Sequence, residues 1–100
     1  MSFSLGQTLA SYTINEAMGS QPFNAFIQNS IRRHHSKDWG DCCEEDKKVN
    51  EESLKMDMRL FSVYNIPTTL KHIDHNGNDK IWIITEADRS ATTIVYPSEY

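Results

Sequence analysis

Two apolar runs near the end of the chain form its clearest pattern. Residues 81–85 and 92–96 are β-branched or aromatic at every position, which favours strands over a helix. Residues 87–90 between them are small or charged, as a tight connection requires, and Pro97 ends the second run. The pattern therefore predicts a β-hairpin around which the fold is organised.

A helical period precedes the hairpin in the first half of the chain. Phe23, Phe26, Ile27 and Ile31 recur on one face of a helix that Ser20 can cap. Arginine and histidine residues follow at its C-terminal end, where cations complement the helix dipole. These features predict an amphipathic helix from about residue 20 to residue 35.

A second, acidic helix is predicted over residues 41–57. Asp41 has the spacing of an N-cap, and acidic residues fill the first turn. Two glutamates precede lysines by four residues, which predicts the local ion pairs Glu44–Lys48 and Glu51–Lys55.

The remaining segments predict further short elements. Residues 59–66 alternate between two faces, as a half-buried strand does, and residues 70–73 could add another strand. Residues 8–12 are compatible with an edge strand, and residues 13–19 with a short helix that Thr13 and Glu16 cap.

Together these elements predict a small single α+β domain over residues 1–100. We expect two or three N-terminal helices packed on a three- to four-stranded antiparallel sheet. The antiparallel strands are expected at residues 59–66, 80–86 and 91–96.

Charge is concentrated in one segment. Residues 38–57 contain eight of the fourteen acidic residues and three lysines, whereas the rest of the chain is close to neutral. The net charge of −4 argues against direct nucleic-acid binding, which normally uses a basic surface.

No apolar run is long enough for a membrane span, so we expect a soluble cytoplasmic protein. The adjacent residues Cys42 and Cys43 are expected to be free thiols, at least one of them packed in the interior.

The acidic segment and the hairpin turn supply the candidate binding residues, namely Asp38, Asp41, Glu44, Glu45, Asp46, Glu86, Asp88 and Arg89. Such a face can contact a partner, imitate nucleic acid or simply keep the protein soluble. Alternatively, the carboxylates Asp41, Glu45 and Asp46, with Glu86 or Asp88, could hold Mg²⁺ in a small hydrolase or nuclease.

Other chemistry has weaker support in the sequence. The histidines lack metal-binding spacing, and a thiol nucleophile at residues 42–43 would have no evident base. No Gly-rich phosphate loop or GxSxG motif is present, so we expect no cofactor and no catalytic residues. Trp39 could be a core residue or could close over a cleft. The oligomeric state is left open by the sequence.

Arg89 offers a link between the two segments that carry these candidates. A guanidinium in the hairpin turn could form two parallel hydrogen bonds to a carboxylate at a helix start. We therefore predict that Arg89 pairs with Asp41 or Glu45.

Three motifs resemble a group of small bacterial proteins associated with plasmids and phages. They are DWGDCCEED at residues 38–46, IWIITEADRS at residues 81–90 and PSEY at residues 97–100. The resemblance covers about two thirds of the chain and brings no activity with it. Its mobile-element setting implies a non-enzymatic protein that binds a protein partner. One possibility is a stoichiometric inhibitor of a host nucleic-acid-processing or defence complex, of the anti-CRISPR or anti-restriction type.

Overall fold

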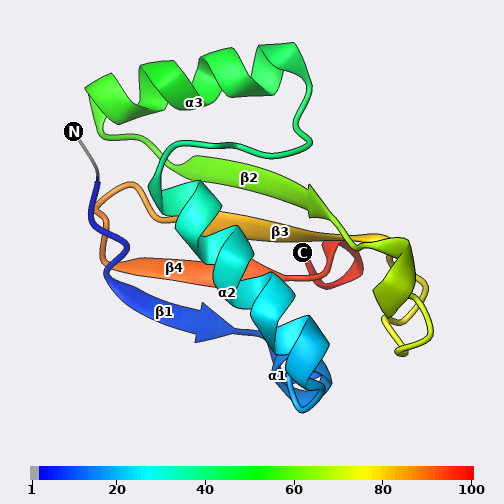
Figure 1. Ribbon diagram of the computed structural model, residues 1–100. Helices are drawn as coiled ribbons and strands as arrows, with labels where there is room; N and C mark the ends of the chain where they lie inside the picture. The colour runs from blue at the N-terminus through cyan, green and yellow to red at the C-terminus, as the bar shows by residue number, and fades with distance from the viewer. Residues whose placement is uncertain (1–2) are drawn as a thin grey trace.

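The computed structural model describes residues 3–100 and shows one sheet with helices beside it (Figure 1). Its elements follow the chain in the order β1 (Gln7–Ala10), α1 (Tyr12–Ala17), α2 (Gln21–His35), α3 (Glu44–Met56), β2 (Leu60–Asn65), β3 (Lys80–Thr85) and β4 (Ala91–Val95). Short 3₁₀ turns at Thr68–Leu70 and Pro97–Glu99 follow β2 and β4. The predicted α+β class is confirmed.

The sheet has the strand order β1-β4-β3-β2. Strands β2, β3 and β4 are antiparallel as predicted, with Ile83 at the centre, opposite Ser62 on one side and Ile94 on the other. The predicted fully antiparallel sheet is wrong, because β1 pairs with β4 in parallel. Parallel neighbours need a long crossover, and the helices between β1 and β2 lie within that connection. The helices are accordingly not all N-terminal to the sheet.

Helix α2 crosses one face of the sheet and buries the apolar stripe that the sequence predicted (Figure 1). Phe23 and Ile27 are fully buried, whereas Phe26 and Ile31 are half-buried at the margin. Alternation along β2 places Leu60 and Tyr64 in the interior, as expected. The main core is formed by Ile14, Phe23, Ile27, Tyr64, Ile66, Leu70, Ile81, Ile83, Ile94 and Tyr96.

The starts of the two N-terminal helices are set by serines. Ser20 caps α2, with its side chain accepting a hydrogen bond from the Phe23 amide at 3.5 Å. Helix α1 begins earlier than predicted, because Ser11 rather than Thr13 is its cap and accepts from the Ile14 amide at 3.2 Å. The cap therefore follows directly from the end of β1.

The strand predicted at residues 70–73 is wrong. Leu70 ends a 3₁₀ turn, and its side chain is buried in the core. Strand β3 already has β2 and β4 as neighbours, so these residues have no place beside it. Within residues 3–100, none of the helices combines the length and the apolar character needed to cross a membrane.

Candidate functional site

Residues 39–41 lie along the outer edge of β2 rather than on an open surface. The Val63 amide donates to the Trp39 carbonyl at 3.2 Å, and the Asp41 amide donates to the Val63 carbonyl at 2.6 Å. Gly40 has a φ of +76°, and a Cβ there would lie 2.0 Å from the Val63 carbonyl oxygen. Only glycine fits this close approach, so the Trp-Gly-Asp sequence serves as a cover for the edge.

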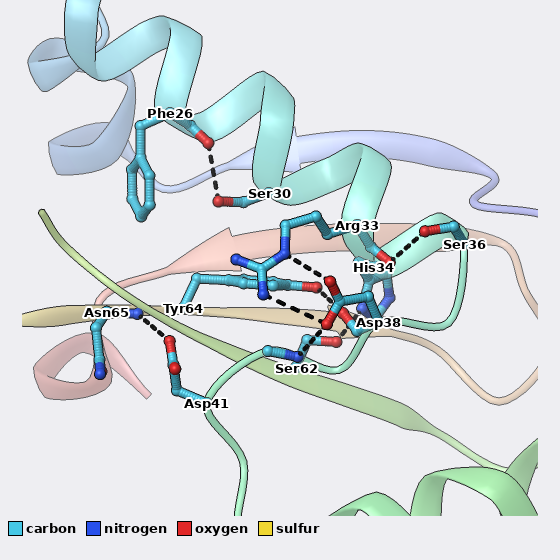
Figure 2. A network of polar contacts seen from close by, with 11 residues as sticks. Phe26, Ser30, Arg33, His34, Ser36, Asp38, Asp41, Ser62, Tyr64 and Asn65 are labelled. Carbon is cyan, nitrogen blue, oxygen red and sulfur yellow. Dashed lines mark hydrogen bonds and ion pairs between the residues drawn. The ribbon is translucent and has the colours of Figure 1, made fainter.

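The Asp41 side chain belongs to the same cover. Its carboxylate accepts a hydrogen bond from the Asn65 amide at 2.9 Å (Figure 2). The prediction that Asp41 caps α3 is wrong, because Cys43 occupies the cap position and forms no side-chain cap bond. The unpaired Asn65 amide at the edge of β2 binds this carboxylate in place of the amides at the start of α3.

Asp38 is held in an ion pair with α2. Arg33 donates to its two carboxylate oxygens at 2.8 and 3.3 Å, and the Gly40 amide donates to it at 3.1 Å (Figure 2). Hydrogen bonding from Arg33 lowers the pKa of the Asp38 carboxyl. The guanidinium also lies 4.8 Å from the centre of the Tyr64 ring. Asp38 therefore fixes the turn after α2, and little of its bonding capacity is left for a partner.

Asn50 attaches α3 to the same edge. Its amide group donates to the Phe61 carbonyl at 2.6 Å, and its carbonyl accepts from the Phe61 amide at 3.0 Å. No local pattern identifies a side chain whose partner is a strand backbone eleven residues away.

Glu44, Glu45 and Asp46 are exposed in the first turn of α3. Glu44 pairs with Lys47 at 3.7 Å. The predicted Glu44–Lys48 and Glu51–Lys55 pairs are not among the ion pairs within residues 3–100. These carboxylates therefore face solvent.

The predicted pairing of Arg89 with Asp41 or Glu45 is wrong. Arg89 donates to the Met58 carbonyl at 2.7 Å and to the Ser53 carbonyl at 3.3 Å, and no carboxylate within residues 3–100 pairs with it. The turn between β3 and β4 lies beside the C-terminal end of α3, the opposite end from Glu45 (Figure 1). A cation there satisfies free carbonyls at the negative end of the helix dipole.

Glu86 and Asp88 share this turn and are exposed. Asp88 accepts a hydrogen bond from the Ser90 amide at 3.0 Å, and hydrogen bonding from Ser90 lowers the pKa of its carboxyl. This turn lies beside the C-terminal end of α3, whereas Glu44, Glu45 and Asp46 lie in the first turn of that helix. The eight predicted binding residues therefore do not form one site.

A chain of buried hydrogen bonds crosses the sheet beneath α2. The Leu5 carbonyl can only accept, so Thr92 donates to it at 2.7 Å and must itself accept from Thr85, also at 2.7 Å. Thr85 then accepts from His34 Nε2 at 2.8 Å, which leaves Nδ1 to accept from Ser62. The chain thus fixes the tautomer of the neutral His34 ring, with the proton on Nε2.

Ser62 and His34 have the pairing of an activated serine nucleophile, with 2.5 Å between Oγ and Nδ1. Both side chains are fully buried, so a substrate has no access to them. Burial, with a smaller effect of His35, lowers the pKa of His34 to about 4. We interpret the pair as a structural link between α2 and the sheet. The pair could not be predicted from a local pattern because its members lie on two separate elements, α2 and β2.

One further histidine, His75, and one thiol, Cys42, are also buried in the interior. Buried His75 donates through Nε2 to the Leu70 carbonyl at 3.0 Å, so its Nδ1 accepts from the Tyr96 hydroxyl at 2.6 Å. Cys42 is buried and Cys43 is exposed, which confirms that one thiol packs inside. Burial raises the pKa of Cys42. Within residues 3–100, no group of three histidine, cysteine or acidic side chains is placed to hold a metal ion.

A cleft of about 460 Å³ opens beside the C-terminal half of α3. It is lined by Phe3, Ser4, Lys37, Glu51, Leu54, Lys55, Asp57 and Arg89. Cations and carboxylates are mixed in this lining, so its charge selects no ligand class. Trp39 lies below the surface and stacks on Phe3 at 6.2 Å, which supports the core interpretation of this tryptophan.

Comparisons of the chain with protein-family models, curated proteins and solved structures gave no significant match. The resemblance to mobile-element proteins stays a prediction from the motifs. The accessible carboxylates of α3 are Glu44, Glu45, Asp46, Glu51 and Glu52, all of them exposed.

Proposed function

We propose that the protein is a non-enzymatic binding module that contacts a protein partner through the exposed side of α3. The observation that carries this proposal is the way α3 attaches. Its buried residues are the polar pair Asn50 and Ser53, so the greater part of the helix surface faces solvent. Leu54 packs on the small cluster of Trp39, Cys42 and Leu60, and the opposite side of the helix is available for a contact outside the molecule.

One line of α3 side chains has the composition of a protein contact. Glu45, Val49, Glu52 and Met56, here called the outer stripe, follow at intervals of four, three and four residues and so share one face. Val49 and Met56 are 57% and 68% exposed. Apolar side chains flanked by carboxylates fit a partner surface with a small apolar centre and basic residues around it.

The neighbouring line of α3 has a different character. Glu44, Lys48, Glu51 and Lys55 alternate in sign along it. Such a line carries no net charge and no apolar side chain, as is usual for a solvated helix face. The comparison favours the outer stripe as the contact.

The partner class follows from the chemistry of the outer stripe and from the motif resemblance. Proteins that process nucleic acid carry basic surfaces, which an acidic helix can occupy by stoichiometric contact. We therefore propose inhibition of a host nucleic-acid-processing or defence complex. The alternative metal-assisted hydrolase has less support, because Asp41 is bonded to β2 and the other carboxylates lie at opposite ends of α3.

Charge reversal on the two faces of α3 tests the contact. The variant Glu45→Lys/Glu52→Lys and the control Glu44→Lys/Glu51→Lys change the net charge equally on one helix. A bacterial partner captured at fixed stoichiometry should bind the first variant at least about tenfold more weakly, and the control should show a much smaller change. Titration calorimetry with the purified partner measures both.

Two outcomes would contradict the proposal. Equal losses in the two variants would indicate general electrostatic attraction instead of a defined contact. A saturable rise in melting temperature with Mg²⁺ or Mn²⁺, reversed by a chelator, would favour the hydrolase.

A further inference from the structure

The two edges of the sheet are treated differently. The outer edge of β2 is bonded to Trp39, Asp41 and Asn50. Strand β1 forms the other border, and Figure 1 shows no helix or strand on its outer side.

The hydrogen bonds to β4 show which groups of β1 face outward. Gln7 donates to the Ser90 carbonyl and Ser11 to the Ile94 carbonyl, both at 3.0 Å. Amides alternate along a strand, so the N–H and C=O groups of Thr8 and Ala10 point away from β4. Within residues 3–100, no side chain bonds to these groups, and neither does any backbone group outside the sheet ladder.

This edge also lacks the usual protection against pairing. Natural edge strands carry lysine, proline or bulges, whereas residues 1–15 contain no charged side chain and no proline. Leu9 and Tyr12 are 42% and 77% exposed beside the edge. Two copies of a chain with net charge −4 would therefore meet here without like charges opposed.

We propose that β1 pairs with β1 of a second copy, antiparallel and about a twofold axis at Leu9. In this register Thr8 lies opposite Ala10 of the second copy, and each pair exchanges two hydrogen bonds. All outward N–H and C=O groups of residues 8 and 10 are then satisfied in both copies. The self-complementary register favours a second copy over an unrelated strand.

The same register brings an apolar contact. Ala10 is aligned with the buried Ile94, so Leu9 lies on the sheet face opposite α2. The two Leu9 side chains would meet there as a non-hydrogen-bonded pair. A strand of four residues buries little area, so we expect a weak dimer, with a dissociation constant in the range of about 1–100 μM. This inference is independent of the contact proposed for α3.

Thr8→Pro is the direct test. The outward amide of Thr8 takes no part in pairing with β4, so proline removes a dimer bond while the ladder to β4 is kept. Thr8→Val keeps the amide and is the matched control. Sedimentation equilibrium from about 1 to 500 μM should show a monomer–dimer equilibrium, weakened at least about tenfold by Thr8→Pro and unchanged by Thr8→Val.

Hydrogen exchange provides a second measurement on the unaltered chain. The Thr8 and Ala10 amides should become protected as concentration rises, whereas the Leu9 amide should be protected throughout. A monomer at every concentration, or a dimer that Thr8→Pro leaves intact, would overturn the proposal. Protection of Thr8 and Ala10 only when another protein is bound would assign the edge to that protein instead.

Discussion

Helices α2 and α3 have similar lengths, 15 and 13 residues, but attach to the sheet by different means. Helix α2 buries aromatic and aliphatic side chains against one face, together with a fully buried histidine. Helix α3 lies at the edge beyond β2 and is bonded to the strand backbone through Asn50. The first attachment removes apolar surface from water, and the second satisfies backbone groups.

The two helices therefore differ in how much they stabilise the fold and in how much surface they leave free for a partner. A helix fixed by its apolar stripe has that stripe occupied, and its solvent face is free only for polar contacts. A helix held mainly by polar contacts can leave apolar residues such as Val49 and Met56 exposed. The comparison predicts a large energetic contribution from α2 and a smaller one from α3.

The largest effect is expected from Phe23→Ala in α2. Removal of this fully buried ring leaves a cavity and should lower the free energy of unfolding by about 3–5 kcal/mol. Chemical denaturation measures the change. The half-buried Phe26, changed to alanine, should cost clearly less, and equal losses at the two positions would contradict the packing described for α2.

The second effect is a loss of stability in acid that originates at the C-terminal end of α2. The pKa of His34 is about 4 in the folded chain and about 6.5 when unfolded, so the unfolded state takes up the proton first. Its contribution, about 3 kcal/mol, is complete above pH 6.5 and is lost as the pH falls to about 4. Unfolding curves across this range should show the loss in the wild type, relative to His34→Gln. Parallel pH profiles for the two proteins would show that His34 titrates normally.

The smallest effect is expected from Asn50→Ala in α3. Two backbone groups of Phe61 lose their partner, and their partial access to water limits the loss to about 2 kcal/mol. Asn50→Asp should not restore stability, because a carboxylate accepts from the Phe61 amide but repels the Phe61 carbonyl. Exposed Glu51→Ala is the control, with little change expected in thermal or chemical unfolding.

Sequence patterns identified the elements whose signal is local. The hairpin of β3 and β4, the stripe on α2 and the alternation in β2 each depend on residues within one segment. The role of Asp41 could not be predicted in this way. Its cap spacing is sound, but the free edge of β2 supplied a better donor.

Arg89 was misassigned for a related reason. The charge pattern indicated an ion pair, whereas the position of the turn beside the end of α3 offered carbonyls instead. Likewise, the parallel pairing of β1 with β4 depends on where the chain returns after two other strands, β2 and β3. Glu44, Glu45 and Asp46 are exposed in the first turn of α3, whereas Glu86 and Asp88 lie in the turn beside its other end, and this separation is a tertiary property.

The pairing of β1 with β4 has a consequence for how the chain folds during synthesis. Gln7 meets Ala91, so β1 is synthesised before its partner β4 and cannot pair until β4 has been made. Until then residues 7–10 have no neighbour in the sheet, although α2 and the meander of β2 and β3 can already begin to assemble. Closing so long a loop slows folding. The four-stranded sheet can be completed only after residues 91–95 have been translated.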